Sequence, residues 1–142
     1  MQEIREVIEA KAALLETGDV KAMLQYYAPQ VVQFSLAPPL GTLADGTDPV
    51  PTEQWVATFD TPPKRTVTRL EITADGDVAF ATSIDSMTAT PRGSAHQFTM
   101  WYRVTIGLRR IDGRWLITHE HESVPFYMDG SLRAAVDLDP PQ

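Results

Sequence analysis

Apolar residues near the N-terminus recur every three or four positions, which is the spacing of an amphipathic helix. The pattern predicts a helix over residues 3–17. Its apolar arc contains Ile4, Val7, Ile8, Leu14 and Leu15. Gly18 is expected to end this helix, because glycine readily adopts the left-handed conformation at a C-terminus. Asp19 is expected to cap a second helix that runs through Tyr27 and is stopped by Pro29.

Farther along the chain the pattern changes to β-branched and aromatic residues, which favour strands. We expect a first strand over 31–36, a loop over 37–51, and then a short helix that is capped by Thr52. This helix carries Trp55 and Phe59 four positions apart, on one face. Turns rich in Asp, Gly and Pro separate the later apolar runs. These runs predict four strands, over 65–74, 77–88, 97–110 and 114–126.

Helices followed by consecutive strands are typical of the α+β class. We therefore expect a curved antiparallel sheet of about four to six strands, wrapped around the N-terminal helices. Residues 1–130 are expected to form one domain, and residues 131–142 a C-terminal tail.

Composition narrows the function. The net charge of −7 and the scattered basic residues argue against a nucleic-acid partner. The chain has no cysteine, which excludes disulfides and thiolate metal sites. We expect a cytoplasmic protein, because no apolar run is long enough to span a membrane and the N-terminus lacks the pattern of a signal peptide. No cofactor is expected, since the sequence contains neither a phosphate-binding nor a dinucleotide-binding glycine motif.

Lys11 lies in the middle of the apolar arc of the first helix. A lysine that faces a core needs a carboxylate partner or must lose its charge. The alternative is that its long apolar stem follows the edge of the arc and carries the ammonium to solvent.

Titratable side chains also alternate along the predicted strand over 114–126. Glu120 and Glu122 share one face, and His119 and His121 share the other, because side chains alternate along a strand. The glutamates either face a polar pocket, as candidate catalytic groups, or lie in solvent.

The face with the two histidines has three interpretations. It forms a homodimer interface, it lines the cavity if a bulge near residues 116–118 reverses the register, or it binds a metal. The proposed interface residues are Trp101, Arg103, Thr105, His119, His121 and Ser123. No metal is expected, because no spacing supplies a third ligand beside the two histidines.

The predicted strand over 97–110 has a continuous apolar face, which is expected to form the concave wall beneath the helices. This wall would line a cavity for a small molecule. The expected lining residues are Ser35, Trp55, Phe80, Thr82, Tyr102, Ile106 and Glu120.

Several local motifs then identify a family resemblance. They are Gly18-Asp19-Val20 followed by Tyr27-Ala28, the run Gly76-Asp77-Val78-Ala79-Phe80, and Arg103-Val104-Thr105 followed by Asp112-Gly113-Arg114-Trp115, His119, His121, Ser123 and Pro125. With the order of elements, they resemble the SnoaL-like, nuclear transport factor 2-like superfamily, which includes ketosteroid isomerase-like proteins and has a cone-shaped fold. The last motif is also similar to the association domain of calcium/calmodulin-dependent protein kinase. The resemblance covers roughly residues 1–127.

The resemblance assigns expected roles to single positions. Lys11 stands where ketosteroid isomerase-like enzymes have their oxyanion-binding tyrosine, and Glu122 stands where the kinase association domain has a pocket arginine. Lys11 and Glu122 would therefore pair across the pocket. Ser35 stands where the isomerase-like enzymes have a carboxylate base, and Thr105 or Ile106 where they have an aspartate. The usual isomerase constellation is thus absent.

The sequence therefore predicts a protein that binds a small, largely apolar molecule carrying a polar group. Catalysis would be isomerase, dehydratase or cyclase chemistry by proton transfer, with Glu122 or a histidine as the base and Lys11 stabilising negative charge. The alternative is a non-catalytic domain for homo-oligomerisation or regulation, because this superfamily supports both kinds of function.

Overall fold

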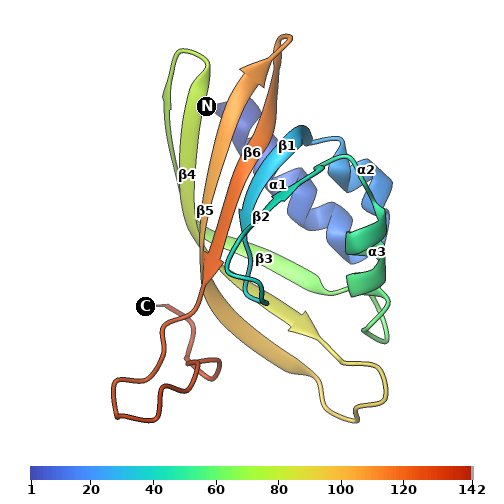
Figure 1. The fold of residues 1–142 in the computed structure, drawn as a ribbon, viewed down its shortest axis with the longest axis vertical. Helices are drawn as coiled ribbons and strands as arrows, with labels where there is room; N and C mark the ends of the chain where they lie inside the picture. The colour runs from blue at the N-terminus through green and yellow to red at the C-terminus, as the bar shows by residue number, and fades with distance from the viewer. Residues whose placement is uncertain (142) are drawn as a thin grey trace.

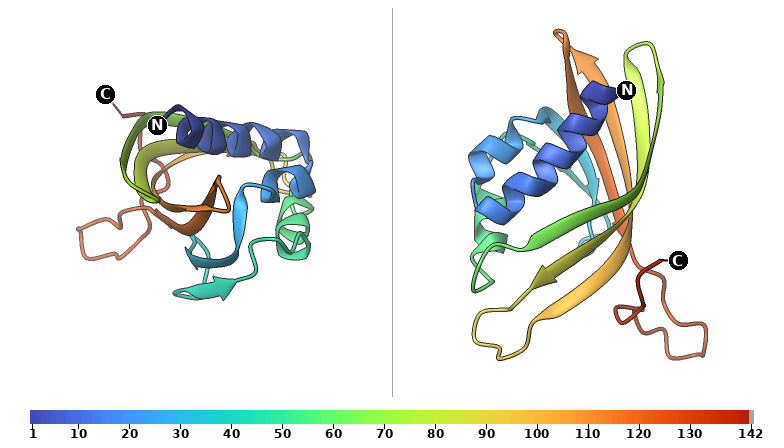
Figure 2. Two further views of the ribbon diagram at one scale, coloured as in Figure 1. Left: turned by 90° about the horizontal axis from the view of Figure 1, so that it is seen from above. Right: turned by 180° about the vertical axis from the view of Figure 1, so that it is seen from behind.

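A long helix, α1 (Gln2–Thr17), lies across the concave face of a strongly curved sheet (Figures 1 and 2). This computed structural model describes residues 1–141. The described chain is α+β, with N-terminal helices packed against a six-stranded sheet, and this confirms the expected fold class. Most neighbouring strands are antiparallel, but β1 (Tyr27–Phe34) runs parallel to β6 (Arg114–Ser123), so the sheet is mixed.

The first helix forms as its apolar arc predicts. Ile4, Ile8 and Leu15 are buried in the core, and Gly18 ends the helix with a left-handed φ of 78°. The Asp19 carboxylate accepts a hydrogen bond from the Ala22 N–H at 3.1 Å and so caps α2 (Val20–Leu24).

The second helix is shorter than predicted, because Tyr27 begins β1 instead of ending α2. Tyr27 pairs with Ile117 of β6, and the burial of both residues outweighs the local helical pattern. Pro29 lies inside the strand and does not precede it. The pairing of β1 with β6 is irregular between Tyr27 and Val32, so the N–H that proline lacks is not needed there.

The segment predicted as a loop contains a short edge strand, β2 (Thr42–Ala44), that pairs with β1. Helix α3 (Val50–Val56) follows with Pro49 at its N-cap, so the prediction that Thr52 caps this helix is wrong. Trp55 and Phe59 meet as predicted, in an edge-to-face pair with ring centroids 5.3 Å apart.

The four later strands form as predicted, except that β6 ends at Ser123 instead of residue 126. The preceding three are β3 (Lys64–Asp75), β4 (Val78–Ala89) and β5 (Phe98–Ile111). The sheet order is β2-β1-β6-β5-β4-β3. Because the sheet curls, α1 packs against its concave side, where β5 contributes Tyr102, Val104, Ile106 and Leu108 to the same core as α1.

A bulge in β6 decides which side chains face this core. Gly107 of β5 pairs with His119, whereas the next residue, Leu108, pairs with Ile117, so Thr118 has no partner on β5. Before the bulge the odd-numbered residues, including Ile117, point inward. After it the even-numbered residues, including Glu120, point inward.

The remaining chain lies beyond the sheet, where residues after β6 form a separate looped segment (Figure 1). It is attached through a bridge between Phe126 and Ala134, and Ala135 is buried. Over residues 1–141, none of the helices has the length and apolar character that crossing a membrane requires.

Candidate functional site

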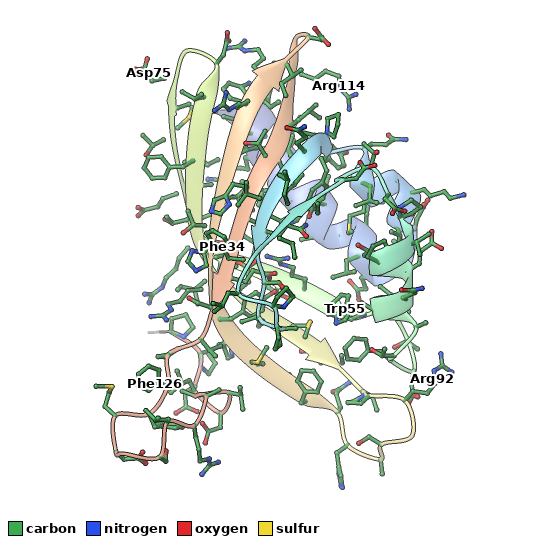
Figure 3. All side chains as sticks on the ribbon, viewed as in Figure 1. Phe34, Trp55, Asp75, Arg92, Arg114 and Phe126 are labelled. Atoms are coloured by element: carbon green, nitrogen blue, oxygen red, sulfur yellow. The ribbon has the colours of Figure 1, made fainter. Side chains whose placement is uncertain are left out.

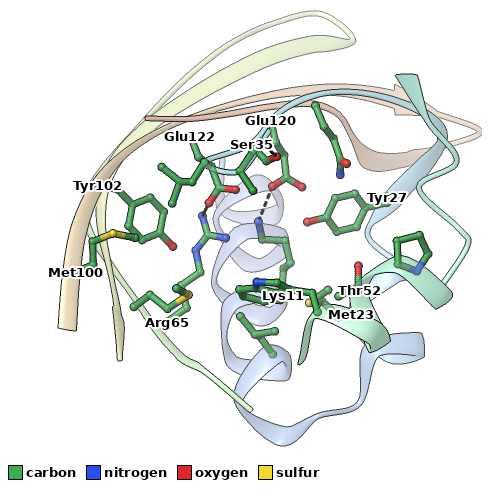
Figure 4. Close-up of a pocket in the computed structure, with 17 residues that line it drawn as sticks. Lys11, Met23, Tyr27, Ser35, Thr52, Arg65, Met100, Tyr102, Glu120 and Glu122 are labelled. Atoms are coloured by element: carbon green, nitrogen blue, oxygen red, sulfur yellow. Dashed lines mark hydrogen bonds and ion pairs between the residues drawn. The ribbon is translucent and has the colours of Figure 1, made fainter. Parts of the chain in front are cut away.

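A cavity of about 430 Å³ lies between α1, α3 and the concave face of the sheet (Figure 4). Much of its wall is apolar, and the apolar contributors include Leu15, Met23, Leu36, Trp55, Met87 and Met100. The exposed members of the wall come from α3 and from the segment just after β1, so the cavity opens between these two elements. Its charged groups come from deeper elements, α1, β3 and β6.

Lys11 occupies the apolar arc as predicted and is buried. Its Nζ lies 3.4 Å from Glu120 Oε2, and the side chains of the two residues are only 3% and 9% exposed. The ammonium also lies 5.7 Å from the centroid of the Tyr27 ring. Burial and the nearby Arg65 guanidinium lower the pKa of Lys11, although Glu120 acts in the opposite direction.

A second buried cation, Arg65 of β3, holds two carboxylates. Its Nε lies 2.8 Å from Asp85 Oδ2, and its Nη2 lies 3.6 Å from Glu122 Oε2. Ser83 donates a hydrogen bond to Asp85 Oδ1 at 2.7 Å, which holds this carboxylate on the guanidinium. The two ion-pair systems therefore stand next to each other on the inner face of the sheet (Figure 4).

The pKa values of Glu120 and Glu122 are shifted in opposite directions, because the charged groups around the two carboxyl groups differ. Burial alone would raise the pKa of Glu120, but Lys11 and Arg65 lower it below its ordinary value. Burial raises the pKa of Glu122, with Glu120 adding to the rise and Arg65 only partly offsetting it. Because its pKa is raised while that of Glu120 is lowered, Glu122 is the better candidate of the two for a general base.

One oxygen of this site has no protein partner. Among buried side-chain nitrogen and oxygen atoms of residues 1–141, Glu120 Oε1 alone makes no hydrogen bond. The Tyr27 hydroxyl points toward this part of the cavity (Figure 4). Burial and the neighbouring Glu120 carboxylate raise the pKa of Tyr27 well above its ordinary value, so its hydroxyl remains protonated.

The structure brings six of the predicted pocket residues into the wall of the cavity: Lys11, Ser35, Trp55, Tyr102, Glu120 and Glu122. Lys11 and Glu122 line the same cavity, but the direct ion pair of Lys11 is with Glu120 and not with Glu122. The difference arises because Arg65 occupies the position next to Glu122. Ser35 uses its hydroxyl to donate to the Ala37 carbonyl at 3.2 Å.

Three residues expected in the pocket lie elsewhere. Phe80 is 51% exposed and Thr82 is exposed, because the inward side chains of β4 are Ala81, Ser83 and Asp85. Ile106 faces inward but is buried in the apolar core and does not line the cavity.

The two histidines lie on the outer face of the sheet. The bulge considered near residues 116–118 is present. It does not turn the histidines into the cavity, however, because it turns Glu120 and Glu122 inward instead. His119 Nδ1 lies 2.7 Å from the Val32 carbonyl oxygen, and both imidazoles meet Phe34 edge-to-face. No group of three or more His, Asp or Glu in the described part of the chain is placed to hold a metal.

Sequence reasoning missed Arg65 and Asp85. The inward orientation of Arg65 could have been predicted, because Arg65 and the apolar Val67 are two positions apart and so share a strand face. Asp85 is likewise two positions from Ser83 and four from Ala81, so the three side chains share the inward face of β4. Tyr27 was predicted at the end of a helix, whereas it begins β1 and lines the cavity.

Comparison with known proteins identifies the same architecture. A model of the SnoaL-like domain matches residues 4–127. A nuclear transport factor 2-like protein of unknown function from Pseudomonas putida KT2440 is 28% identical, with a TM-score of 0.83 over 98% of this chain and 95% of that one. None of the proteins with curated functions matches this sequence.

Two more distant structures show the same fold. A candidate scytalone dehydratase from Novosphingobium aromaticivorans is 14% identical, with a TM-score of 0.77 over 100% of this chain and 95% of that one. A candidate calcium/calmodulin-dependent protein kinase II association domain from Xanthomonas campestris is 21% identical, with a TM-score of 0.71 over 85% and 84%. These likenesses concern the fold and do not assign an activity.

We predict that Lys11→Met lowers the free energy of unfolding by about 3–5 kcal/mol, because it leaves the buried Glu120 carboxylate without its cation. Adding Glu120→Leu should recover a large part of this loss, since the double variant contains neither buried charge. Urea unfolding of the four proteins of this double-mutant cycle measures the coupling.

The exposed ion pair between Arg5 and Glu9, at 3.3 Å, provides the control. Arg5→Met should cost less than about 1 kcal/mol, because solvent screens an exposed pair. Equal losses for Arg5→Met and Lys11→Met would contradict the assigned role of the buried pair.

We predict that Glu122→Gln becomes more favourable for stability, relative to the wild type, as the pH rises above about 4.5. A raised pKa means that the folded protein favours the neutral carboxyl group, so its contribution to stability is present below the ordinary pKa of 4.5 and is lost as the pH rises through the folded value. The neutral glutamine has no such loss. Thermal unfolding across a pH series measures the difference, and a trend of opposite sign would refute the assignment.

Proposed function

We propose that this chain, which belongs to the SnoaL-like domain family, binds a small, largely apolar molecule carrying a polar group and acts on it by proton transfer. The observation that carries the proposal is the cavity of about 430 Å³, in which the buried Lys11 and the half-buried Glu122 lie beside apolar side chains. Such a cavity with a few convergent polar groups is typical of small-molecule sites.

Each polar group has a role in this proposal. The Glu122 carboxylate removes a proton from a carbon next to the carbonyl group of the ligand, and the C–H electron pair becomes that of an enolate. The Lys11 ammonium stabilises the negative oxygen, because it retains donors beyond the one directed to Glu120. Arg65 is a positioning residue that holds Glu122 in place.

The subsequent fate of the enolate determines the type of reaction. Return of the proton from Glu122 to another carbon completes an isomerisation. In a dehydration the enolate re-forms its carbonyl and expels a β-hydroxyl group, which takes the proton from Glu122 and leaves as water. The fold shared with a candidate scytalone dehydratase is compatible with either reaction. The alternative, a non-catalytic assembly domain, is less well supported, because such a domain needs no buried acid beside an open cavity.

We predict that the protein accelerates exchange of the α-hydrogens of 2-tetralone, an apolar ketone, for deuterium in D2O. Glu122→Gln should reduce the exchange rate by about 10²–10⁴-fold, because it removes the general base. Mass spectrometry of the recovered ketone measures the exchange.

The matched control is Glu53→Gln, which removes a negative charge from an exposed position on α3 and should leave the rate unchanged. Binding of the ketone without exchange would leave ligand binding in place and refute proton transfer. An exchange rate for Glu122→Gln equal to that of the wild type would refute the base assignment.

We also propose that the outer face of the sheet forms a homodimer interface. It displays apolar side chains beside polar ones, and Figure 3 shows Phe34 on this side of the molecule. Val32, Phe34 and Phe80 are 40%, 38% and 51% exposed. Among the neighbouring polar groups, Arg103 donates a hydrogen bond to Ser123 at 3.2 Å. Aromatic and arginine side chains together are typical of protein interfaces.

We predict that the protein is a dimer in light scattering at micromolar concentration, and that Trp101→Glu converts it to a monomer by placing an unpaired charge in the interface. Val50→Glu, at a position on α3 that is 51% exposed, is the control and should remain dimeric. A monomeric wild type would refute this interface.

A further inference from the structure

We infer that the ligand of the cavity is a neutral molecule whose hydroxyl group donates a hydrogen bond to Glu120 Oε1. This inference rests on the proposed function and specifies the class of molecule that the site accepts. It narrows the polar group of the expected ligand to an uncharged hydrogen-bond donor.

The first argument is the free acceptor at Glu120. Oε2 accepts from Lys11, whereas Oε1 is buried and has no partner in residues 1–141. A buried carboxylate oxygen that lacks a donor costs free energy, so in the empty cavity we expect water to supply one. A ligand that displaces this water must supply a donor itself, or affinity is lost.

The second argument is the balance of charge. Three carboxyl groups, from the buried Asp85 and Glu120 and the half-buried Glu122, surround two cations, Lys11 and Arg65. Each cation already lies within 3.6 Å of a carboxylate oxygen. A ligand carboxylate or phosphate would add a negative charge to a site in which the cations are already neutralised, so a neutral donor is favoured.

The third argument is the remaining wall of the cavity. Met23, Met87, Met100 and Trp55 present polarizable and aromatic surfaces that suit a flat apolar skeleton. The protonated Tyr27 hydroxyl near Glu120 is able to donate to the same ligand oxygen, so a ligand hydroxyl finds both an acceptor and a donor.

Three naphthalene derivatives of similar size test the inference by titration calorimetry. 2-Naphthol has a donor, 2-methoxynaphthalene has an acceptor only, and 2-naphthoate is an anion. We expect the wild type to bind 2-naphthol at least tenfold more tightly than either of the other two compounds. In Glu120→Gln the amide oxygen faces Lys11 and its NH2 group takes the place of Oε1. The preference for 2-naphthol over 2-methoxynaphthalene should therefore fall to less than threefold.

Glu53→Gln is the control, because it makes the same chemical change at an exposed position on α3 that does not line the cavity. It should retain the tenfold preference for 2-naphthol. Thermal unfolding of each variant establishes that it is folded before titration.

The outcomes separate the two proposals. Equal binding of 2-naphthol and 2-methoxynaphthalene by the wild type would overturn this inference and leave small-molecule binding in place. Tighter binding of 2-naphthoate would overturn it in favour of an anionic ligand. A preference that survives in Glu120→Gln would show that Oε1 is not the acceptor. Failure of the wild type to bind any of the three would overturn both proposals.

Discussion

The buried contact between Lys11 and Glu120 is the interaction on which the inner half of the molecule depends. The helix that carries Lys11 packs its apolar arc against the sheet, so the ammonium enters a region with little access to solvent. A charge in such a place must be paired, and Glu120 on the inward face of β6 supplies the carboxylate. The same contact holds α1 at one side of a cavity instead of a filled core.

The pairing in turn depends on the extra residue at Thr118. Trp115 and Ile117 point into the core, and a regular strand would place His119 and His121 on the same side. The bulge reverses the alternation once, so the carboxylates enter the cavity and the imidazoles face outward. One inserted residue thus determines the chemistry of both faces of the sheet.

The two ion-pair systems of the cavity contain carboxyl groups whose pKa values are shifted in opposite directions. Glu120 is held ionised by Lys11 and Arg65, whereas burial favours the neutral form of Glu122. Adjacent carboxyl groups whose pKa values are moved apart are typical of sites that perform acid–base chemistry. The family and the fold by themselves do not assign this chemistry, because the same architecture is shared by a candidate dehydratase and a candidate kinase association domain.

The sequence by itself determined the α+β class, the first helix with Lys11 on its apolar arc, and the later strands, because periodicity and turn residues are local signals. It also placed Glu120 and Glu122 on one face, which is true of any strand. Only the tertiary structure decided which face turns inward, since the bulge depends on the pairing with β5. The tertiary structure also decided that Arg65 pairs with Glu122 and that Lys11 pairs with Glu120, because residues distant in the sequence meet only after the sheet curls.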